Sequence, residues 1–241
     1  MSPPTVQPPY FDNQALPSSP SESYVAWFDI MGIRSSMLRS LPITSNFIFK
    51  LHVATLEEKP ADVRLYPVMD GVYIAASEKE ELRSFLRSVF VRLAVLFTST
   101  TENRHRFLAK CAVAYGPIIH GADIDAHASP IFAENTANTT YKDSILLGMP
   151  MVFALQTESL APPFGVAIHD SARDFFEPSE RKWSHVWWPW FPFSTCQEAK
   201  SLRSALKEYF DWCEKRAGAI DYEPTRIMAH RAQAEQYFVD A

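Results

Sequence analysis

The segment YVAWFDIMGI at residues 24–33 decides how the rest of the chain is interpreted. Its apolar residues are typical of a buried strand, and one carboxylate, Asp29, stands where that strand ends. Gly32 follows, and a helical pattern begins at Arg34. Burying an unpaired carboxylate is unfavourable unless a cation or hydrogen-bond donors compensate for it. One hypothesis for this segment is a metal ion at Asp29 with phosphate on the backbone that follows. The alternative is an Asp that caps the next helix.

Composition and charge restrict the class of protein. The chain has 241 residues, of which 47% are hydrophobic and 21% charged, as in a soluble protein with one large core. Its net charge of −5 argues against general nucleic-acid binding. No segment approaches the roughly 18 consecutive apolar residues of a membrane span, and the three cysteines have no metal-type spacing. We expect a cytoplasmic protein with reduced thiols and with no nucleic-acid or membrane partner.

Helical and strand patterns alternate in an order that predicts an α+β fold. After the first strand, the expected elements are a helix at 34–59 interrupted near Pro42, strands at 63–69 and 72–76, a helix at 78–99, and a strand at 107–115 continued at 118–121. Two β-rich runs around Asp70-Gly71 are a strong hairpin signal. This order predicts a ferredoxin-like, mostly antiparallel central sheet with helices on one face.

The chain divides into three parts. Residues 1–20 are Pro-rich and are expected to form a flexible arm. Residues 21–180 hold the predicted sheet domain. Residues 181–241 are expected to pack on that domain; they comprise an aromatic segment at 183–193, interpreted as a core or dimer patch, and C-terminal helices at 197–218 and 224–239.

Two carboxylates, Asp29 and Asp70, are expected at the same edge of this sheet. Asp29 ends the first strand, and Asp70 lies at the tip of the neighbouring hairpin. With the Ile30 carbonyl as a third oxygen ligand, they are a suitable donor set for one or two Mg²⁺ or Mn²⁺ ions that bridge a triphosphate. Asp-Gly turns are also common without a metal, so the pair is more specific than either residue alone.

Four segments of the chain, in this order, resemble the motifs of the class III nucleotide cyclases. They are FDIMG at 28–32, VMDGVYIA at 68–75, KCAVAYGPIIHG at 110–121 and ILLGMPMVFA at 145–154. Five of the seven glycines of the chain fall within them. The resemblance implies a cyclase catalytic domain over residues 21–180 that converts a nucleoside triphosphate into a 3′,5′-cyclic monophosphate with two divalent ions, Mn²⁺ or Mg²⁺. It also implies a homodimer with two equivalent sites at its interface.

The resemblance further implies which residues contact the nucleotide. Asp29 and Asp70 would be the catalytic, metal-binding carboxylates, with Ile30 as a main-chain metal ligand. The nucleotide-binding set would be Phe28, Asp29, Ile30, Met31, Gly32, Ile33, Tyr66 and Asp70.

The base-reading positions depart from those of the purine cyclases in the family. Where those proteins carry a Lys and an acidic or polar residue, this chain has Tyr66 and Ile145. Loss of both hydrogen-bonding groups removes ordinary purine readout. The pattern resembles the pyrimidine cyclases of the bacterial Pycsar anti-phage systems. That resemblance implies UTP, less strongly CTP, as the substrate, and a cyclic nucleotide messenger read by a separate effector protein.

The positions of the family's transition-state Asn and Arg fall, by gapless spacing, on Val152 and Gln156. Neither side chain gives the charge-assisted hydrogen bonds that stabilise a phosphoryl group in transfer. The candidates for replacement phosphate contacts are Arg34, Arg64, Lys110 and Lys142. The alternatives are a degenerate cyclase that binds a nucleotide and signals without chemistry, and a purine cyclase with unusual base contacts.

Overall fold

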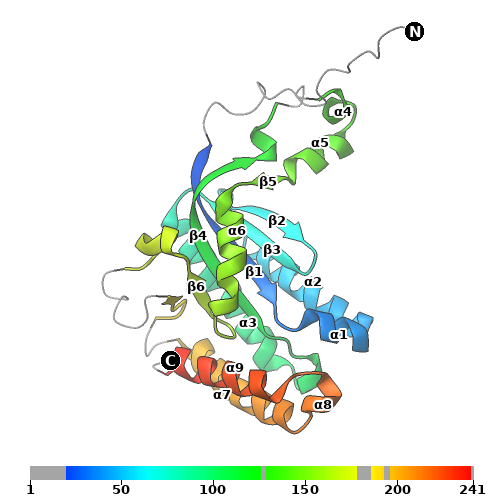
Figure 1. Cartoon of the computed structure of the whole chain (residues 1–241), viewed down its shortest axis with the longest axis vertical. Helices are drawn as coiled ribbons and strands as arrows, with labels where there is room; N and C mark the ends of the chain where they lie inside the picture. Colours follow the sequence, from blue (N-terminus) through cyan, green and yellow to red (C-terminus); the bar gives the residue numbers. More distant parts are fainter. Residues whose placement is uncertain (1–19, 126–128, 178–185, 193–195, 240–241) are drawn as a thin grey trace, which may run out of the picture.

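The computed structural model describes residues 20–125, 129–177, 186–192 and 196–239. The flexible arm expected at residues 1–20 lies outside these ranges except for its last residue, as does part of the aromatic segment. Within them the chain forms one central sheet with helices on both faces and a helical segment across one end (Figure 1).

The sheet has seven strands in the described residues, in the order β2-β3-β1-β4-β6-β7, with β5 paired to β4 off this path. The strands are β1 (Ser21–Ile30), β2 (Arg64–Val68), β3 (Gly71–Ala76), β4 (Ala109–His120), β5 (Leu146–Leu147), β6 (Val166–Ile168) and β7 (Trp187–Trp188). All neighbouring strands are antiparallel except the parallel pair β4–β6. The predicted α+β fold with a mostly antiparallel central sheet is therefore confirmed.

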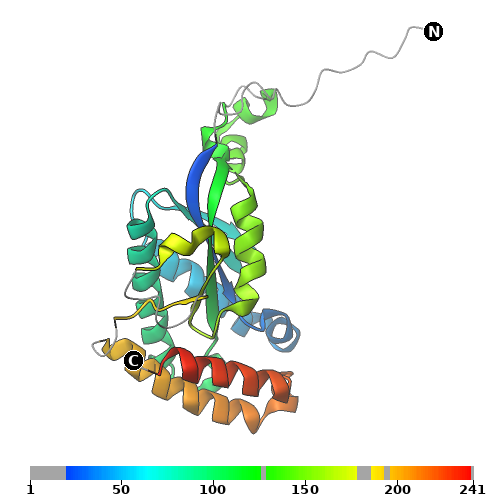
Figure 2. The same ribbon diagram turned by 60° about the vertical axis from the view of Figure 1, so that its left-hand side comes forward.

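Helices cover both faces of the sheet (Figure 2). α2 (Leu41–Glu57) and α3 (Lys79–Ser99) pack on one face, and α6 (Met149–Thr157) packs on the other, against β1 and β4. The expectation of helices on one face only was wrong. Successive side chains of β1 point to opposite faces, and both sets are buried: Phe28 enters one core and Trp27 the other.

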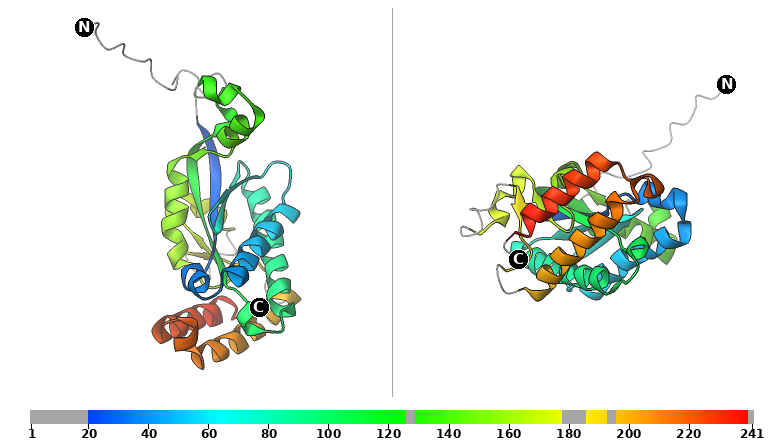
Figure 3. Two further views of the ribbon diagram at one scale, coloured as in Figure 1. Left: turned by 90° about the vertical axis from the view of Figure 1, so that its right-hand side faces the viewer. Right: turned by 90° about the horizontal axis from the view of Figure 1, so that it is seen from below.

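The helix break predicted near Pro42 falls at Ser40, between α1 (Ile33–Arg39) and α2. The other helices are α4 (Pro130–Ala133), α5 (Thr136–Asp143), α7 (Gln197–Glu214), α8 (Ala217–Ile220) and α9 (Pro224–Tyr237), with 3₁₀ turns at 103–105, 121–123, 158–160 and 170–175. α7 packs on α3, and α9 packs on α7, so the C-terminal helices lie across the end of the sheet where β1 finishes (Figure 3). Among the described residues, no helix has the length and apolar character needed to cross a membrane.

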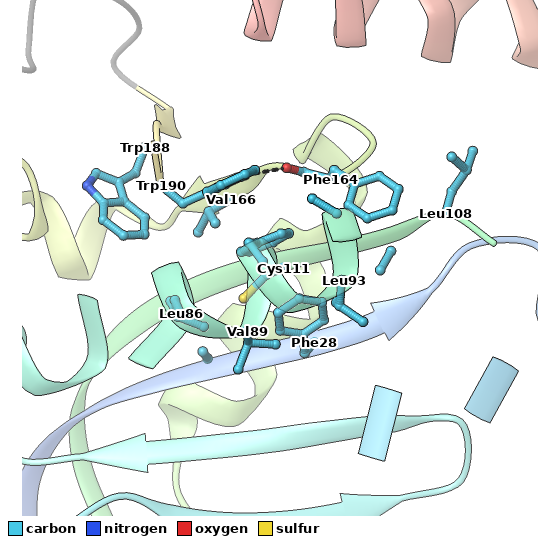
Figure 4. Packing of buried hydrophobic residues seen from close by; sticks show 14 of the residues in the cluster. Phe28, Leu86, Val89, Leu93, Leu108, Cys111, Phe164, Val166, Trp188 and Trp190 are labelled. Atoms are coloured by element: carbon cyan, nitrogen blue, oxygen red, sulfur yellow. Dashed lines mark hydrogen bonds between the residues drawn. The ribbon is translucent and has the colours of Figure 1, made fainter. Parts of the chain in front are cut away.

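The larger core lies between the sheet and α3 (Figure 4). Phe28 of β1 and Leu86 of α3 belong to it, together with the buried Trp188 and Trp190. The indole N–H of Trp190 donates to the Phe164 carbonyl at 2.8 Å, which satisfies its one polar group. Trp188, Trp190 and Phe191 of the 183–193 segment therefore lie in the core, and the partly buried Trp187 packs against it. Burial of each such side chain contributes about 1.5–3 kcal/mol.

The β2–β3 hairpin turns at Met69 and Asp70, one residue earlier than the Asp70-Gly71 turn predicted from the sequence. Val68 pairs with Gly71, and Met69 adopts a left-handed conformation with a φ of 53°. Gly71 is needed for a different reason, because a Cβ there would lie 2.4 Å from the Trp27 ring and 2.6 Å from a main-chain oxygen of β1. The glycine allows the hairpin to approach β1 closely, and this places Asp70 next to the end of that strand.

Candidate active site

Asp29 and Asp70 lie at the same end of the sheet. Asp29 is the last residue but one of β1, and Asp70 immediately precedes Gly71, which packs against the β1 main chain. The two side chains are close enough for the charge of Asp70 to raise the pKa of Asp29. The structure thus brings together the two carboxylates that the sequence analysis paired.

The carboxyl group of Asp29 is half-buried in negatively charged surroundings. Its pKa rises from 3.8 to about 7, chiefly because burial disfavours the charged form, and further because of repulsion from Glu158 and Asp70. A hydrogen bond from the Ile30 N–H and the charge of Lys110 oppose this rise. A divalent cation would remove the repulsion, so the donor set fits Mg²⁺ or Mn²⁺.

The side chains of Asp29 and Asp70 would supply only part of the ligands of a metal ion at this site. No group of three or more His, Cys, Asp or Glu side chains suited to a metal ion occurs in the described part of the chain. Because Mg²⁺ and Mn²⁺ take about six oxygen ligands, the remaining ligands must be main-chain, water or substrate phosphate oxygens. An ion at this site would therefore be bound most strongly together with a polyphosphate.

Lys110 on β4 is the register partner of Asp29 on β1. Its Nζ is 2.8 Å from Oε1 of Glu158, which follows α6, and only 14% and 12% of these two side chains are exposed. Of the four candidate cations, Lys110 is the one that lines the same cavity as Asp29. Glu158 had no signal in the sequence, because its position depends on how the chain after α6 returns to the sheet.

The other three candidate cations lie elsewhere. Arg34 is exposed on α1 and does not line that cavity. Arg64 forms an ion pair with Asp123 at 3.1 Å. Lys142 is buried, and its Nζ donates to two main-chain carbonyls at 2.6 and 2.8 Å. Its ammonium group therefore satisfies loop carbonyls and is not available to a phosphate, which corrects the role suggested from the sequence.

The loop between β1 and α1 opens toward the cavity of Asp29. Gly32 has a φ of 73°, and a Cβ added there would meet nothing within 4 Å. The Met31 N–H, however, donates to the Leu108 carbonyl at 2.8 Å. The phosphate cradle predicted at residues 31–33 is therefore smaller than expected, because the first of its N–H groups already bonds to the protein.

The two base-pocket candidates meet around His120, a residue that the sequence analysis missed. The Tyr66 hydroxyl is hydrogen-bonded to Nδ1 of His120, and the two rings stack with centroids 5.8 Å apart. The Ile145 carbonyl accepts a hydrogen bond at 2.8 Å from the N–H that follows His120. Burial lowers the pKa of His120, with the charge of Arg64 adding to the effect, and burial raises the pKa of Tyr66. Both side chains are therefore uncharged at neutral pH.

Helix α6 carries Val152 and Gln156 on its exposed side. No Lys, Arg or His occurs in this helix, whose sequence is MPMVFALQT. The positive charge that is absent from these two positions is therefore not supplied by a neighbour on the same helix.

The cavity that contains Asp29 is closed on its far side by the C-terminal helices. Its volume is about 390 Å³, and its walls come from residues 29–33, α1, the start of α2, residues 103–110 and α7–α9. The Ser35 hydroxyl of α1 donates to Asp221 at the end of α8 at 2.8 Å, which ties the two walls together. Arg226 and His230 of α9 line the cavity. Sequence reasoning missed both, because no local pattern indicates contact between opposite ends of a chain.

Comparison with solved structures identifies the class of this fold. The chain is similar to the guanylyl cyclase domain of the RhoGC fusion protein from the aquatic fungus Blastocladiella emersonii, with 14% identity over 66% of this chain and 87% of that chain and a TM-score of 0.50. It is similar to a bacterial light-regulated adenylyl cyclase, with 14% identity over 65% of this chain and 45% of that chain and a TM-score of 0.50. No protein-family model and no curated protein matches the sequence.

The chain therefore has the fold of a class III nucleotide cyclase catalytic domain. At 14% identity this likeness defines the fold, and the chemistry follows only from the side chains described above.

Proposed function

We propose that the chain is a nucleotide cyclase whose substrate is a pyrimidine nucleoside triphosphate, UTP in preference to CTP. The observation that carries this proposal is the pairing of Asp29 with Asp70 at one end of a cyclase-type sheet. Two half-buried carboxylates that repel each other weaken a fold unless a cation binds between them. Their retention therefore supports a metal-dependent reaction over a purely structural role.

Asp29, the Ile30 carbonyl and Asp70 would hold two divalent ions, Mn²⁺ or Mg²⁺, which when bound supply Lewis acidity and neutralise charge on the triphosphate. In the proposed reaction the ribose O3′ bonds to the α-phosphorus, the bond from that phosphorus to pyrophosphate breaks, and the hydroxyl proton passes to solvent. Lys110 and the loop at residues 31–33 would orient the phosphates in the cavity.

The proposed pyrimidine preference rests on the pair Tyr66 and His120. Both are neutral, so they offer hydrogen bonds of the kind that an uncharged uracil or cytosine edge can complement. Tyr66 is buried, and in this proposal its ring fills space that a larger purine would need. Ile145, next to this pair, adds no side-chain hydrogen bond.

A homodimer is the proposed assembly, with a second messenger as the proposed product. Met149, Val152 and Leu155 of α6 are 54%, 41% and 49% exposed, and adjacent apolar side chains of this kind are typical of an interface. The resemblance to Pycsar cyclases suggests a cytoplasmic enzyme whose cyclic nucleotide acts on a separate effector protein in anti-phage defence. Sedimentation of the purified chain would test the dimer directly.

The second candidate is a nucleotide-binding module without catalysis. Val152 and Gln156 favour it, because neither is a cation that would give the charge-assisted hydrogen bonds that stabilise a phosphoryl group in transfer. A purine cyclase is the third candidate and conflicts with the side chains present at positions 66 and 145.

The test is turnover of ATP, GTP, CTP and UTP, each with Mn²⁺, with products identified by mass spectrometry. Cyclic UMP or cyclic CMP that disappears in Asp70→Ala would establish the proposal. Cyclic AMP or cyclic GMP would overturn the assignment of the base. Binding of nucleotide without any cyclic product would favour the second candidate.

A further inference from the structure

The C-terminal helices lie across the end of the sheet (Figures 2 and 3). Residues of α7, α8 and α9 line one side of the cavity that contains Asp29. The α9 wall carries Arg226 and His230, and the opposite wall carries Asp29 and Lys110. The charges of Lys110 and Arg226 both act on His230, which shows that α9 comes close to the start of β4. A small ligand in this cavity therefore has α9 on one side and the Asp29 end of the sheet on the other.

Most positive side chains around this cavity are already engaged by the fold. Lys110 is 2.8 Å from Glu158, and Arg104 is 2.6 Å from Glu102. Arg106 donates to the Thr100 carbonyl at 2.9 Å and to Asn103 at 2.8 Å. Arg39, which also lines the cavity, donates from Nε to the Ser35 carbonyl at 3.2 Å. Each of these cations therefore has at least one contact within the fold.

Arg226 differs from these cations. It is exposed, lines the cavity, and forms no hydrogen bond or ion pair with any residue in the described ranges. A guanidinium carries five N–H donors in a planar fork that matches phosphate oxygens. Arg226 is therefore a cation in this cavity with its full donor set available to a ligand.

His230 lies one helical turn after Arg226, and its surroundings fix its tautomer and its protonation state. Its Nδ1 is hydrogen-bonded to the Tyr222 hydroxyl. Burial raises the pKa of Tyr222, so the hydroxyl keeps its proton, and we assign it as the donor to Nδ1. Burial, Lys110 and Arg226 lower the pKa of His230 to about 4, so the ring is neutral at pH 7 and carries its proton on Nε2. Nε2–H is then a fixed donor on the α9 wall.

We infer that Arg226 and His230 of α9 are the phosphate-binding residues of this cavity, and that they hold the polyphosphate of the substrate opposite the carboxylate Asp29. The inference rests on the proposed function for the identity of the nucleotide, but the ligand chemistry that it assigns is the polyphosphate alone. A linear polyphosphate suits this cavity because its oxygens can meet a cation at the Asp29 end and a guanidinium at the other. The C-terminal helices are thus part of the substrate site and supply donors that α6 lacks.

The experiment is calorimetric titration of the full chain with inorganic tripolyphosphate and, separately, with UTP, each in Mn²⁺. Arg226→Gln should weaken binding of both ligands about ten- to a hundredfold, which corresponds to one lost charge-assisted hydrogen-bonding group. Arg226→Lys should recover part of the affinity, because the charge returns without the fork. His230→Phe should weaken both ligands to a smaller extent, and His230→Gln, which keeps an N–H donor, should be closer to wild type.

Lys215→Gln is the matched control. Lys215 follows α7, is exposed and does not line the cavity, so its replacement removes one positive charge from the C-terminal helices without changing the cavity. The affinity for both ligands should therefore be unchanged. Equal affinities of wild type and Arg226→Gln for tripolyphosphate would overturn the inference, as would binding of neither ligand by wild type. An effect of Arg226→Gln on UTP but not on tripolyphosphate would also overturn it, since the residue would then recognise the nucleoside.

Failure of the proposed function gives a different result. If the variants weaken tripolyphosphate as expected while no nucleoside triphosphate is cyclised, the phosphate site stands and the cyclase assignment fails. If a cyclic pyrimidine nucleotide forms and Arg226→Gln binds tripolyphosphate normally, the cyclase assignment stands and this inference fails.

Discussion

The Nζ of Lys110 lies 2.8 Å from Oε1 of Glu158, and this ion pair is mostly buried next to Asp29. The pair joins the second residue of β4 to the turn that follows α6, so it links the Asp29 end of the sheet to α6 on the face of the sheet. Glu158 also raises the pKa of Asp29, while Lys110 lowers it. The pair therefore contributes both to the fold and to the charge of the site.

Glu158→Gln should destabilise the protein by about 1–3 kcal/mol, because it leaves the ammonium of Lys110 poorly compensated in a mostly buried position. The free energy of unfolding, measured by urea denaturation, checks this. The double variant Lys110→Met/Glu158→Leu is the control, since it removes both charges and should recover part of the loss. A double variant that loses as much stability as the single variants Lys110→Met and Glu158→Leu lose together, or more, would contradict an ion-pair origin.

Asp29→Asn should raise the stability of the metal-free protein at pH 8. The folded-state pKa of Asp29 is about 7 and the unfolded value is 3.8, so the native state holds the proton more tightly. The contribution of Asp29 to the free energy of unfolding is full below pH 3.8 and is lost as the pH rises through 7. The side chain introduced by Asp29→Asn carries no charge, so the variant does not lose this contribution at high pH. Thermal unfolding at pH 4 and pH 8 should show a larger advantage of Asn at pH 8, on the order of a few kcal/mol at most.

The same thermal unfolding measurement, repeated with Mn²⁺ and tripolyphosphate, tests whether Asp29 binds a metal ion. The added ion and polyphosphate should stabilise wild type at pH 8 and stabilise Asp29→Asn much less, because an amide is a poor ligand for a hard cation. Equal stabilisation of both proteins would mean that Asp29 does not bind the ion.

Gly71→Ala should destabilise the protein by about 2 kcal/mol or more. The added Cβ would lie 2.4 Å from the Trp27 ring and 2.6 Å from a main-chain oxygen of β1, so the hairpin has to move away. Gly218→Ala in α8 is the matched control: nothing lies within 4 Å of its Cβ, and alanine in a helix gains about 0.5–1 kcal/mol over glycine. Denaturation midpoints of the two variants should shift in opposite directions.

Tyr66→Phe should reduce discrimination between UTP and ATP, because it removes the hydroxyl that orients His120 beside the proposed base pocket. Loss of that buried hydrogen bond should also lower stability by about 1–2 kcal/mol. The control is Tyr73→Phe, at the register partner of Tyr66 on β3, whose hydroxyl has no hydrogen bond to any described residue. The ratio of kcat/KM for UTP and ATP should change in the first variant and stay constant in the second.

The sequence by itself determined the elements that depend on local chemistry. The apolar run of β1 followed by Asp29 predicted a strand with a carboxylate at its end, and alternating β-rich residues around Asp70 predicted the hairpin that brings the second carboxylate beside it. These follow from side-chain period and turn preference, which act over a few residues. The resemblance of four glycine-containing segments to the motifs of the class III nucleotide cyclases predicted the cyclase fold.

Only the tertiary structure decided which polar groups surround that carboxylate pair. The sequence suggested Lys142 as a phosphate contact, but packing buries it and its ammonium group donates to loop carbonyls. Arg226 and His230 had no signal in the sequence. They reach the cavity because α7 packs on α3 and α9 packs on α7. These contacts join residues far apart along the chain, and they depend on how helices fit over the end of the sheet. Local hydrophobic period and helix propensity do not predict these contacts, because the free energy that stabilises them comes from burying apolar surface between distant elements.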